Sequence, residues 1–151
     1  MTEKNVDYTL GFLFYECYCV LIKKNRPDWQ QGQLNGIGGK VKKDELVIDA
    51  MVREFNEEAG IPLCRLQGVQ WDAVTMMKLM STDSRVHVYG GHWTWGSSFF
   101  DVVDPFVDNN DEGIPTIVNT NKLPDNVLPN LHWLLPMARR PRDAPELISF
   151  I

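Results

Sequence analysis

The sequence is poor in cysteine, in basic residues and in long apolar runs, and each shortage excludes a class of protein. Its three cysteines among 151 residues make neither a disulfide framework nor a zinc-ligand pattern, which suits a reducing compartment. The apolar run Leu10–Ile22 is too short to span a bilayer and contains Glu16. The first residues, MTEKNVD, lack the basic segment and apolar core of a secretory signal. We therefore expect a cytoplasmic protein that makes no membrane contact.

Acidic residues outnumber basic ones by 20 to 15, which gives a formal net charge of −5. Proteins that bind extended nucleic acid or anionic membranes normally present a basic patch, so neither partner is expected. One small anionic substrate remains compatible with this charge, because a bound metal ion inverts the local sign. The expected partner is therefore a small molecule, and a homodimer is also compatible with the sequence.

The residue patterns predict one mixed α/β (α+β) domain that covers residues 1–151. Asp44 is positioned to cap a helix near residues 45–58, and Gly60 is positioned to end it. A second helix is expected at Asp125–Arg139. Runs of aromatic and branched residues predict strands at Tyr8–Phe14, Tyr18–Lys23, Val69–Met80, Arg85–Tyr89, Trp93–Val103 and Ile114–Val118.

The first predicted helix carries three glutamates, Glu54, Glu57 and Glu58, near its end. On a helical wheel, Glu54 and Glu58 continue the apolar stripe that begins at Val47, and Glu57 lies at the edge of that stripe. Buried carboxylates need a compensating partner, and a hard cation such as Mg²⁺ or Mn²⁺ suits oxygen ligands. The alternative is a helix end that has emerged into water, and the helix pattern alone does not decide between the two.

The residues upstream of these glutamates complete a longer motif. The segment GKVKKDELVIDAMVREFNEEAGI at residues 39–61 fits G-x5-E-x7-R-E-U-x-E-E-x-G-U, where U is a bulky apolar residue. This pattern resembles the Nudix box, a 23-residue loop–helix–loop signature, with Phe55 aromatic where aliphatic residues are commoner. The resemblance implies an α/β/α sandwich around a mixed sheet. It also implies hydrolysis of nucleoside diphosphates linked to a further group X, with Mg²⁺ as cofactor and Mn²⁺ as a substitute.

The resemblance assigns metal ligands and catalytic groups by their position in the motif. The implied metal ligands are Glu54, Glu57, Glu58, a backbone carbonyl near Gly38, and Glu112, where some family members carry an additional ligand or base. Glu57 is the first candidate for the general base and Glu58 is the second. Arg53, four residues before Glu57, is expected to brace that carboxylate. For Glu112, a solvated acidic loop shared with Asp111 is an equal alternative.

Two further segments bear on the substrate. LNGIGGKV resembles the WNGFGGKV-type entry of the oxidised-purine nucleoside triphosphatases, whereas LPNLHWLLP departs from their WPDDSYWFP-type segment because Asn130 and Leu131 replace paired aspartates. The implied substrate-binding residues are Asn35, Gly39, Lys40, Asn130 and Trp133.

The predicted reaction is hydrolysis of intact or damaged (d)NTPs to nucleoside monophosphate and pyrophosphate. The alternative substrates are ADP-ribose, NADH or dinucleoside polyphosphates. A catalytically silent module that senses nucleotides is a third hypothesis, and the complete set of box glutamates argues against it.

Overall fold

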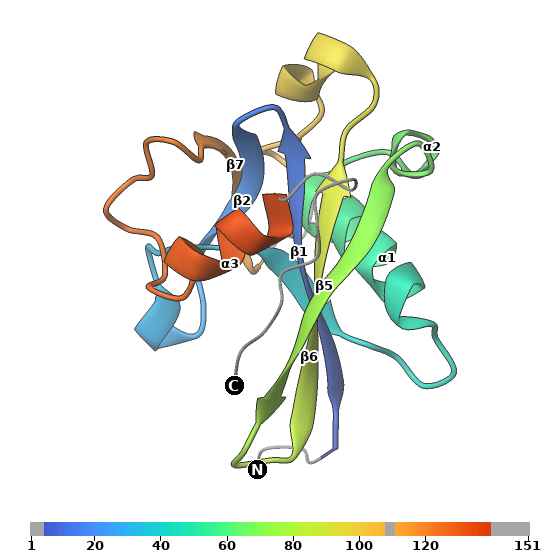
Figure 1. The fold of residues 1–151 in the computed structure, drawn as a ribbon, viewed down its shortest axis with the longest axis vertical. Coiled ribbons are helices and arrows are strands. Elements are labelled where there is room, and N and C mark those ends of the chain that lie inside the picture. The colour runs from blue at the N-terminus through green and yellow to red at the C-terminus, as the bar shows by residue number, and fades with distance from the viewer. Residues whose placement is uncertain (1–4, 108–110, 140–151) are drawn as a thin grey trace.

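A computed structural model describes residues 5–107 and 111–139 of the chain (Figure 1). The helices are α1 (Val47–Ala59), α2 (Leu63–Leu66) and α3 (Leu131–Arg139), with two 3₁₀ segments, η1 (Asp28–Gln30) and η2 (Gly96–Asp101). The strands are β1 (Asp7–Tyr15), β2 (Tyr18–Lys24), β3 (Leu34–Asn35), β4 (Ile37–Lys40), β5 (Gln70–Leu79), β6 (Ser84–His92) and β7 (Gly113–Asn119). No helix within the described ranges is long and apolar enough to cross a membrane.

All these strands join one mixed sheet. Its main path runs β3-β2-β1-β6-β5, while β4 pairs with β1 and β7 pairs with β2. The β1–β6 pair is parallel, from Asp7 opposite Arg85 to Phe14 opposite His92, and every other strand pair is antiparallel. β1 therefore lies at the centre of the sheet, where it positions both β4 and α1.

Two separate apolar cores cover the two faces of this sheet. α1 contributes Met51 and Phe55, both fully buried, to one core. α3 contributes Leu131 and Leu134, also fully buried, to the other. Figure 1 shows α3 in front of the sheet and α1 behind it. This arrangement confirms the predicted mixed-sheet α/β/α sandwich, because each helix buries one apolar stripe against one face.

The predicted strand at Trp93–Val103 is wrong. β6 ends at His92, and η2 follows at Gly96–Asp101. Side-chain hydrogen bonds fix the turn between them: Trp95 Nε1 donates to the Arg65 carbonyl at 3.1 Å, and Ser98 Oγ donates to the Trp95 carbonyl at 2.8 Å. Such local bonds compete with strand pairing, which aromatic content alone does not predict.

Both helix starts differ from the prediction. α1 begins at Val47, and Asp44 does not cap it, because Asp44 has a φ of 64° and the capping position is held by Leu46. The predicted end is confirmed, since Gly60 adopts a φ of 68° and its N–H bonds to the Asn56 carbonyl. The second helix begins at Leu131 and not at residue 125, because residues 126–128 pair their backbone with β3 instead.

Candidate functional site

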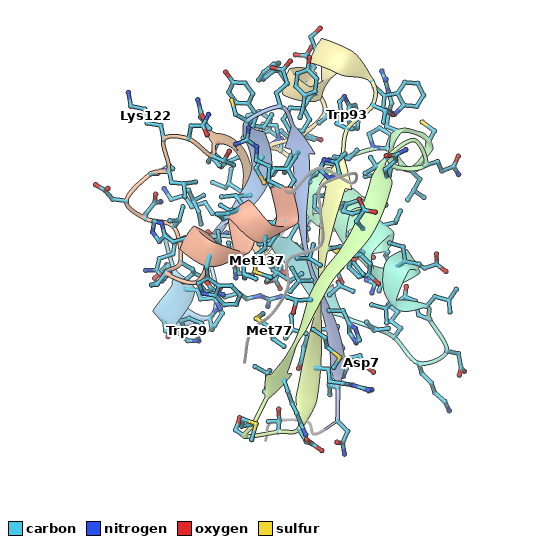
Figure 2. All side chains as sticks on the ribbon, in the orientation of Figure 1. Asp7, Trp29, Met77, Trp93, Lys122 and Met137 are labelled. Carbon is cyan, nitrogen blue, oxygen red and sulfur yellow. The ribbon has the colours of Figure 1, made fainter. Side chains whose placement is uncertain are left out.

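A cavity of about 790 Å³ opens between the sheet, the carboxyl-terminal half of α1, η1 and residues 128–130. One section of its wall is charged, with residues Lys24, Lys40, Glu54, Glu58 and Glu112. Another section is largely apolar and carries side-chain amides, with residues Leu10, Trp29, Gln30, Asn35, Met77, Val86, Leu128 and Asn130. Figure 2 shows Trp29 and Met77 at a similar height, both below α3. A cavity with a charged section and an apolar section suits a ligand that has one charged part and one apolar part.

Glu54 and Glu58 supply the buried acidic wall. They lie one turn apart on α1, and only 8% and 6% of their surfaces are exposed. Their place in the apolar stripe is therefore confirmed, and the alternative of a solvated helix end is excluded for this pair. Gly39 of β4 allows the close approach, because a Cβ at that position would lie 2.5 Å from Glu54 Oε1.

Burial sets the electrostatics of this wall. It raises the pKa of Glu58 to about 8, and repulsion from Glu54 adds to the shift. The charge of Lys24 and a backbone hydrogen bond at Gly38 act in the opposite direction. Burial also raises the pKa of Glu54, although Arg53 lowers it in part. Both carboxyl groups resist ionisation because they are buried next to each other. A cation bound between them would stabilise their ionised forms.

Arg53 connects the helix to the loop that precedes it. Its guanidinium donates through Nη1 to Glu54 Oε1 at 2.9 Å and to Glu57 Oε2 at 3.1 Å. Through Nη2 it donates to the Lys40 carbonyl at 3.0 Å. The guanidinium also makes a bidentate contact with Glu45, in which Nε donates to Oε2 at 2.9 Å and Nη2 donates to Oε1 at 3.1 Å. The predicted contact between Arg53 and Glu57 is present, and it is one of several.

Glu45, the first glutamate of the motif, bonds both to Arg53 and to the loop before α1. Besides the two bonds from Arg53, its Oε1 accepts the Lys42 backbone N–H at 3.0 Å. The hydrogen bonds from Arg53, followed by the one from Lys42, lower the pKa of Glu45 to about 2. Glu45 thus fixes the loop before α1 and orients the guanidinium that holds Glu54.

Glu57 lies apart from the other two glutamates. Its side chain is 51% exposed, and it is not among the residues that line the cavity. Its described partner is Arg53, one turn earlier on the same helix. The structure therefore brings Glu54 and Glu58 together at the cavity, whereas the role of Glu57 as ligand and base stays a prediction.

Glu112 comes directly before β7 and lines the charged section of the cavity together with Glu54 and Glu58. Its Oε2 accepts from Lys24 Nζ at 2.9 Å, and its Oε1 accepts from Arg26 Nη2 at 2.6 Å. Burial acts to raise the pKa of Glu112, but the hydrogen bonds from Lys24 and Arg26 lower it overall. The reading of Glu112 as a free solvated carboxylate is therefore wrong. Lys24 is a site residue that the sequence analysis missed, and a lysine near a strand end gives little signal by itself.

The implied substrate-binding residues divide into two groups. Asn35, Gly39, Lys40 and Asn130 all line the cavity, while Trp133 on α3 does not. The Asn35 amide is held in place, since its Oδ1 accepts the Gly36 N–H at 2.8 Å and its Nδ2 donates to Gln30 at 3.3 Å. Trp29 lines the cavity instead, with 71% of its surface exposed.

The acidic wall formed by Glu54 and Glu58 suits a divalent cation. Within the described part of the chain, no three His, Cys, Asp or Glu side chains lie close enough together to hold one metal ion. Glu57 is half exposed and does not line the cavity, and Lys24 and Arg26 hold Glu112. Glu54 and Glu58 remain as paired hard-oxygen donors in a buried setting, which is the donor type that Mg²⁺ prefers. These two residues fit the implied metal and would hold it.

Comparisons with known structures show the same fold. A MutT Nudix hydrolase from Burkholderia pseudomallei is 20% identical, with a TM-score of 0.66 over 89% of this chain and 98% of that one. A Nudix-family hydrolase from Clostridium perfringens is 14% identical, with a TM-score of 0.64 over 88% and 93%. An ADP-ribose pyrophosphatase from Streptococcus suis is 20% identical, with a TM-score of 0.57 over 80% and 78%. No curated protein sequence matches the chain.

A family comparison decides the assignment. The model of the NUDIX domain matches residues 11–134, which is most of the chain and includes the whole 39–61 motif. That match, on a fold already seen in Nudix hydrolases, shows that the chain belongs to the NUDIX domain family and is an enzyme of the Nudix pyrophosphohydrolase class.

Proposed function

We propose that this chain is an Mg²⁺-dependent pyrophosphohydrolase of nucleoside diphosphate derivatives, with (d)NTPs as the first substrate class. One observation carries the proposal: a single cavity joins the paired carboxylates of Glu54 and Glu58 to an apolar, amide-bearing section. Its volume of about 790 Å³ lies in the range of pockets for small-molecule ligands. A nucleotide has the matching division into a charged phosphate chain and a planar base.

The charged section would take the phosphates. Mg²⁺, held by Glu54 and Glu58, would neutralise the diphosphate and make a bound water more acidic. Arg53 keeps Glu54 in place through a hydrogen bond of 2.9 Å, so the carboxylate is preorganised. Glu57, held by the same guanidinium but half exposed, is the first candidate to accept a proton from the attacking water, with Glu58 as the second.

The apolar section would take the base. The exposed indole of Trp29 offers a face for stacking at the cavity wall. Asn35 and Asn130 add side-chain amides, which can both donate to and accept from the edge of a base. Because the Asn35 amide is already held by Gly36 and Gln30, it forms a rigid element of the wall.

A second substrate class rests on a departure in the sequence. Asn130 and Leu131 stand where the oxidised-purine triphosphatases carry paired aspartates, which weakens the argument for oxidised purines. One similar fold, from Streptococcus suis, is described as an ADP-ribose pyrophosphatase. ADP-ribose, NADH and dinucleoside polyphosphates are therefore the alternative substrates.

Product analysis on a nucleotide panel tests this proposal. The purified chain is incubated with Mg²⁺ and each (d)NTP, oxidised (d)NTP, ADP-ribose, NADH or dinucleoside polyphosphate, and the products are separated by chromatography and mass spectrometry. Pyrophosphate with a nucleoside monophosphate supports the first class, and two monophosphates from ADP-ribose support the second. Release of orthophosphate alone, or no reaction above a blank that contains only Mg²⁺, contradicts the proposal.

A further inference from the structure

Glu112 is held from both sides by cations. The ammonium of Lys24 lies 2.9 Å from Oε2, while Arg26 contacts Oε1 through Nη2 at 2.6 Å and through Nε at 3.0 Å. The Lys24 side chain is only 13% exposed, whereas that of Arg26 is 60% exposed at the rim. Each carboxylate oxygen therefore has its own cation. Lys24 is the last residue of β2, and Arg26 lies in the loop that follows this strand.

The backbone holds this cluster as well. The Asn25 N–H donates to the Glu112 carbonyl at 2.7 Å, directly between the two residues that grip its side chain. Lys24 lies opposite Gly113 in the β2–β7 pair, so Glu112 is fixed at the end of a regular ladder. The backbone carbonyl of Glu112 is bonded to Asn25, and its carboxylate is bonded to two cations. The side chain is therefore preorganised for a structural task.

The charges of the cluster do not cancel. Two cations and one carboxylate leave a net charge of +1, in the same charged section of the cavity wall as the acidic pair of α1. Lys24 lines the cavity, and its charge acts to lower the pKa of Glu58 there. The charged section thus holds the anionic pair Glu54 and Glu58 together with the cationic Lys24, and a diphosphate bound there would meet a metal at the pair and the ammonium of Lys24.

We infer that Glu112 is a positioning residue that presents Lys24 to the substrate diphosphate, and that it is not a metal ligand. This inference rests on the proposed function and corrects the ligand role implied by the resemblance. Without Glu112, the flexible lysine would lose the bond that fixes its ammonium, and the position of that positive charge in the cavity would no longer be set. In the rival arrangement, a metal draws Glu112 away from Lys24 and binds it directly.

Metal binding distinguishes the two arrangements without any need for activity. Mn²⁺ binding to the full chain is followed by the loss of the free Mn²⁺ signal in electron paramagnetic resonance. The variants are Glu112→Gln, Glu58→Gln, and Asp111→Asn as a matched control that removes one exposed charge from the same loop. We expect Glu112→Gln to match Asp111→Asn within about threefold, whereas Glu58→Gln weakens binding by roughly tenfold or more. A tenfold or greater loss for Glu112→Gln relative to Asp111→Asn overturns the inference.

Kinetics test the part of the inference that concerns Lys24. Because Lys24 is proposed to bind the diphosphate, Lys24→Met should raise KM by roughly tenfold while kcat stays within about threefold. Lys24→Arg keeps the cation and should recover part of that loss, which a merely structural role would not predict. Glu112→Gln should change KM in the same direction as Lys24→Met. An unchanged KM in both Lys24→Met and Glu112→Gln overturns the inference.

Failure of the inference and failure of the proposed function give different results. If the wild-type chain hydrolyses no nucleotide with Mg²⁺, the proposed function fails, and the Mn²⁺ titration still decides whether Glu112 is a ligand. If the wild-type chain is active and Glu112→Gln loses Mn²⁺ together with activity, only the inference fails.

Discussion

Replacing Glu58 with glutamine should stabilise the metal-free protein at neutral pH. Glu58 is 6% exposed, and burial together with Glu54 raises its pKa from 4.5 to about 8. Between these two pH values the folded chain holds a proton that the unfolded chain has lost, so stability falls as the pH rises through this window. The loss is complete above the folded-state pKa, and below about pH 4.5 it is absent.

The size of this penalty follows from the shift. Each pKa unit corresponds to about 1.4 kcal/mol, so the penalty from Glu58 grows from about 1 kcal/mol at about pH 5 to about 3 kcal/mol at about pH 7. Glutamine keeps the shape of the side chain and carries no charge, so it removes the penalty at both values. The difference in unfolding free energy between Glu58→Gln and wild type should therefore grow by about 2 kcal/mol between these conditions.

Denaturant unfolding in EDTA at the two pH values measures this difference. Other titrating groups are common to both proteins and cancel in the comparison. Added Mg²⁺ should then stabilise the wild type more than the variant, because the cation binds the folded carboxylates. If Glu58→Gln is less stable than wild type near pH 7, or if the difference does not change with pH, the pKa of Glu58 is not raised in the folded chain and the reasoning fails.

Three further substitutions test the surroundings of the site. Arg53→Lys cannot reproduce the bidentate contact with Glu45 or bond to Glu54 and Glu57 at the same time. Steady-state kinetics should therefore show kcat at least roughly tenfold lower with KM little changed. A large rise in KM alone would make Arg53 a phosphate ligand. Gly39→Ala places a methyl group 2.5 Å from Glu54 Oε1, so calorimetric titration with Mn²⁺ should show weaker binding, and unchanged affinity would contradict the close approach. Phe55→Ala removes a fully buried ring that packs on the indole at residue 71, and should cost about 3–5 kcal/mol in denaturant unfolding; a cost below about 1 kcal/mol would contradict its place in the core.

The central part of the fold was predictable because local signals agreed there. α1 combines a 3.6-residue apolar stripe with a glycine stop at Gly60, and both hold in the structure. Glu54 and Glu58 follow from the same stripe, since side chains one turn apart must share a face. The strand predicted at Trp93–Val103 failed because side-chain bonds from Trp95 and Ser98 hold that segment as a turn, and composition does not encode those partners.

The rest of the site depends on contacts between distant residues. Glu112 and Lys24 are 88 positions apart, and only the β2–β7 pairing brings them together. Glu45 likewise joins Arg53, eight positions later, because the loop before α1 folds back. Sequence patterns identify the residues that one element carries, whereas the partners of those residues come from the packing of several elements.

The central claim is that Glu54 and Glu58 would hold the cation on which hydrolysis of a nucleotide diphosphate depends, and the variant in which both are glutamine tests it most directly. Conversion of the best substrate from the panel to its monophosphate is followed by chromatography, with Mg²⁺ or with EDTA, for wild type and the double variant. We expect monophosphate only from the wild type with Mg²⁺, while the double variant stays folded and is no less stable than wild type in EDTA. Equal turnover by the double variant, or by wild type in EDTA, would contradict the claim.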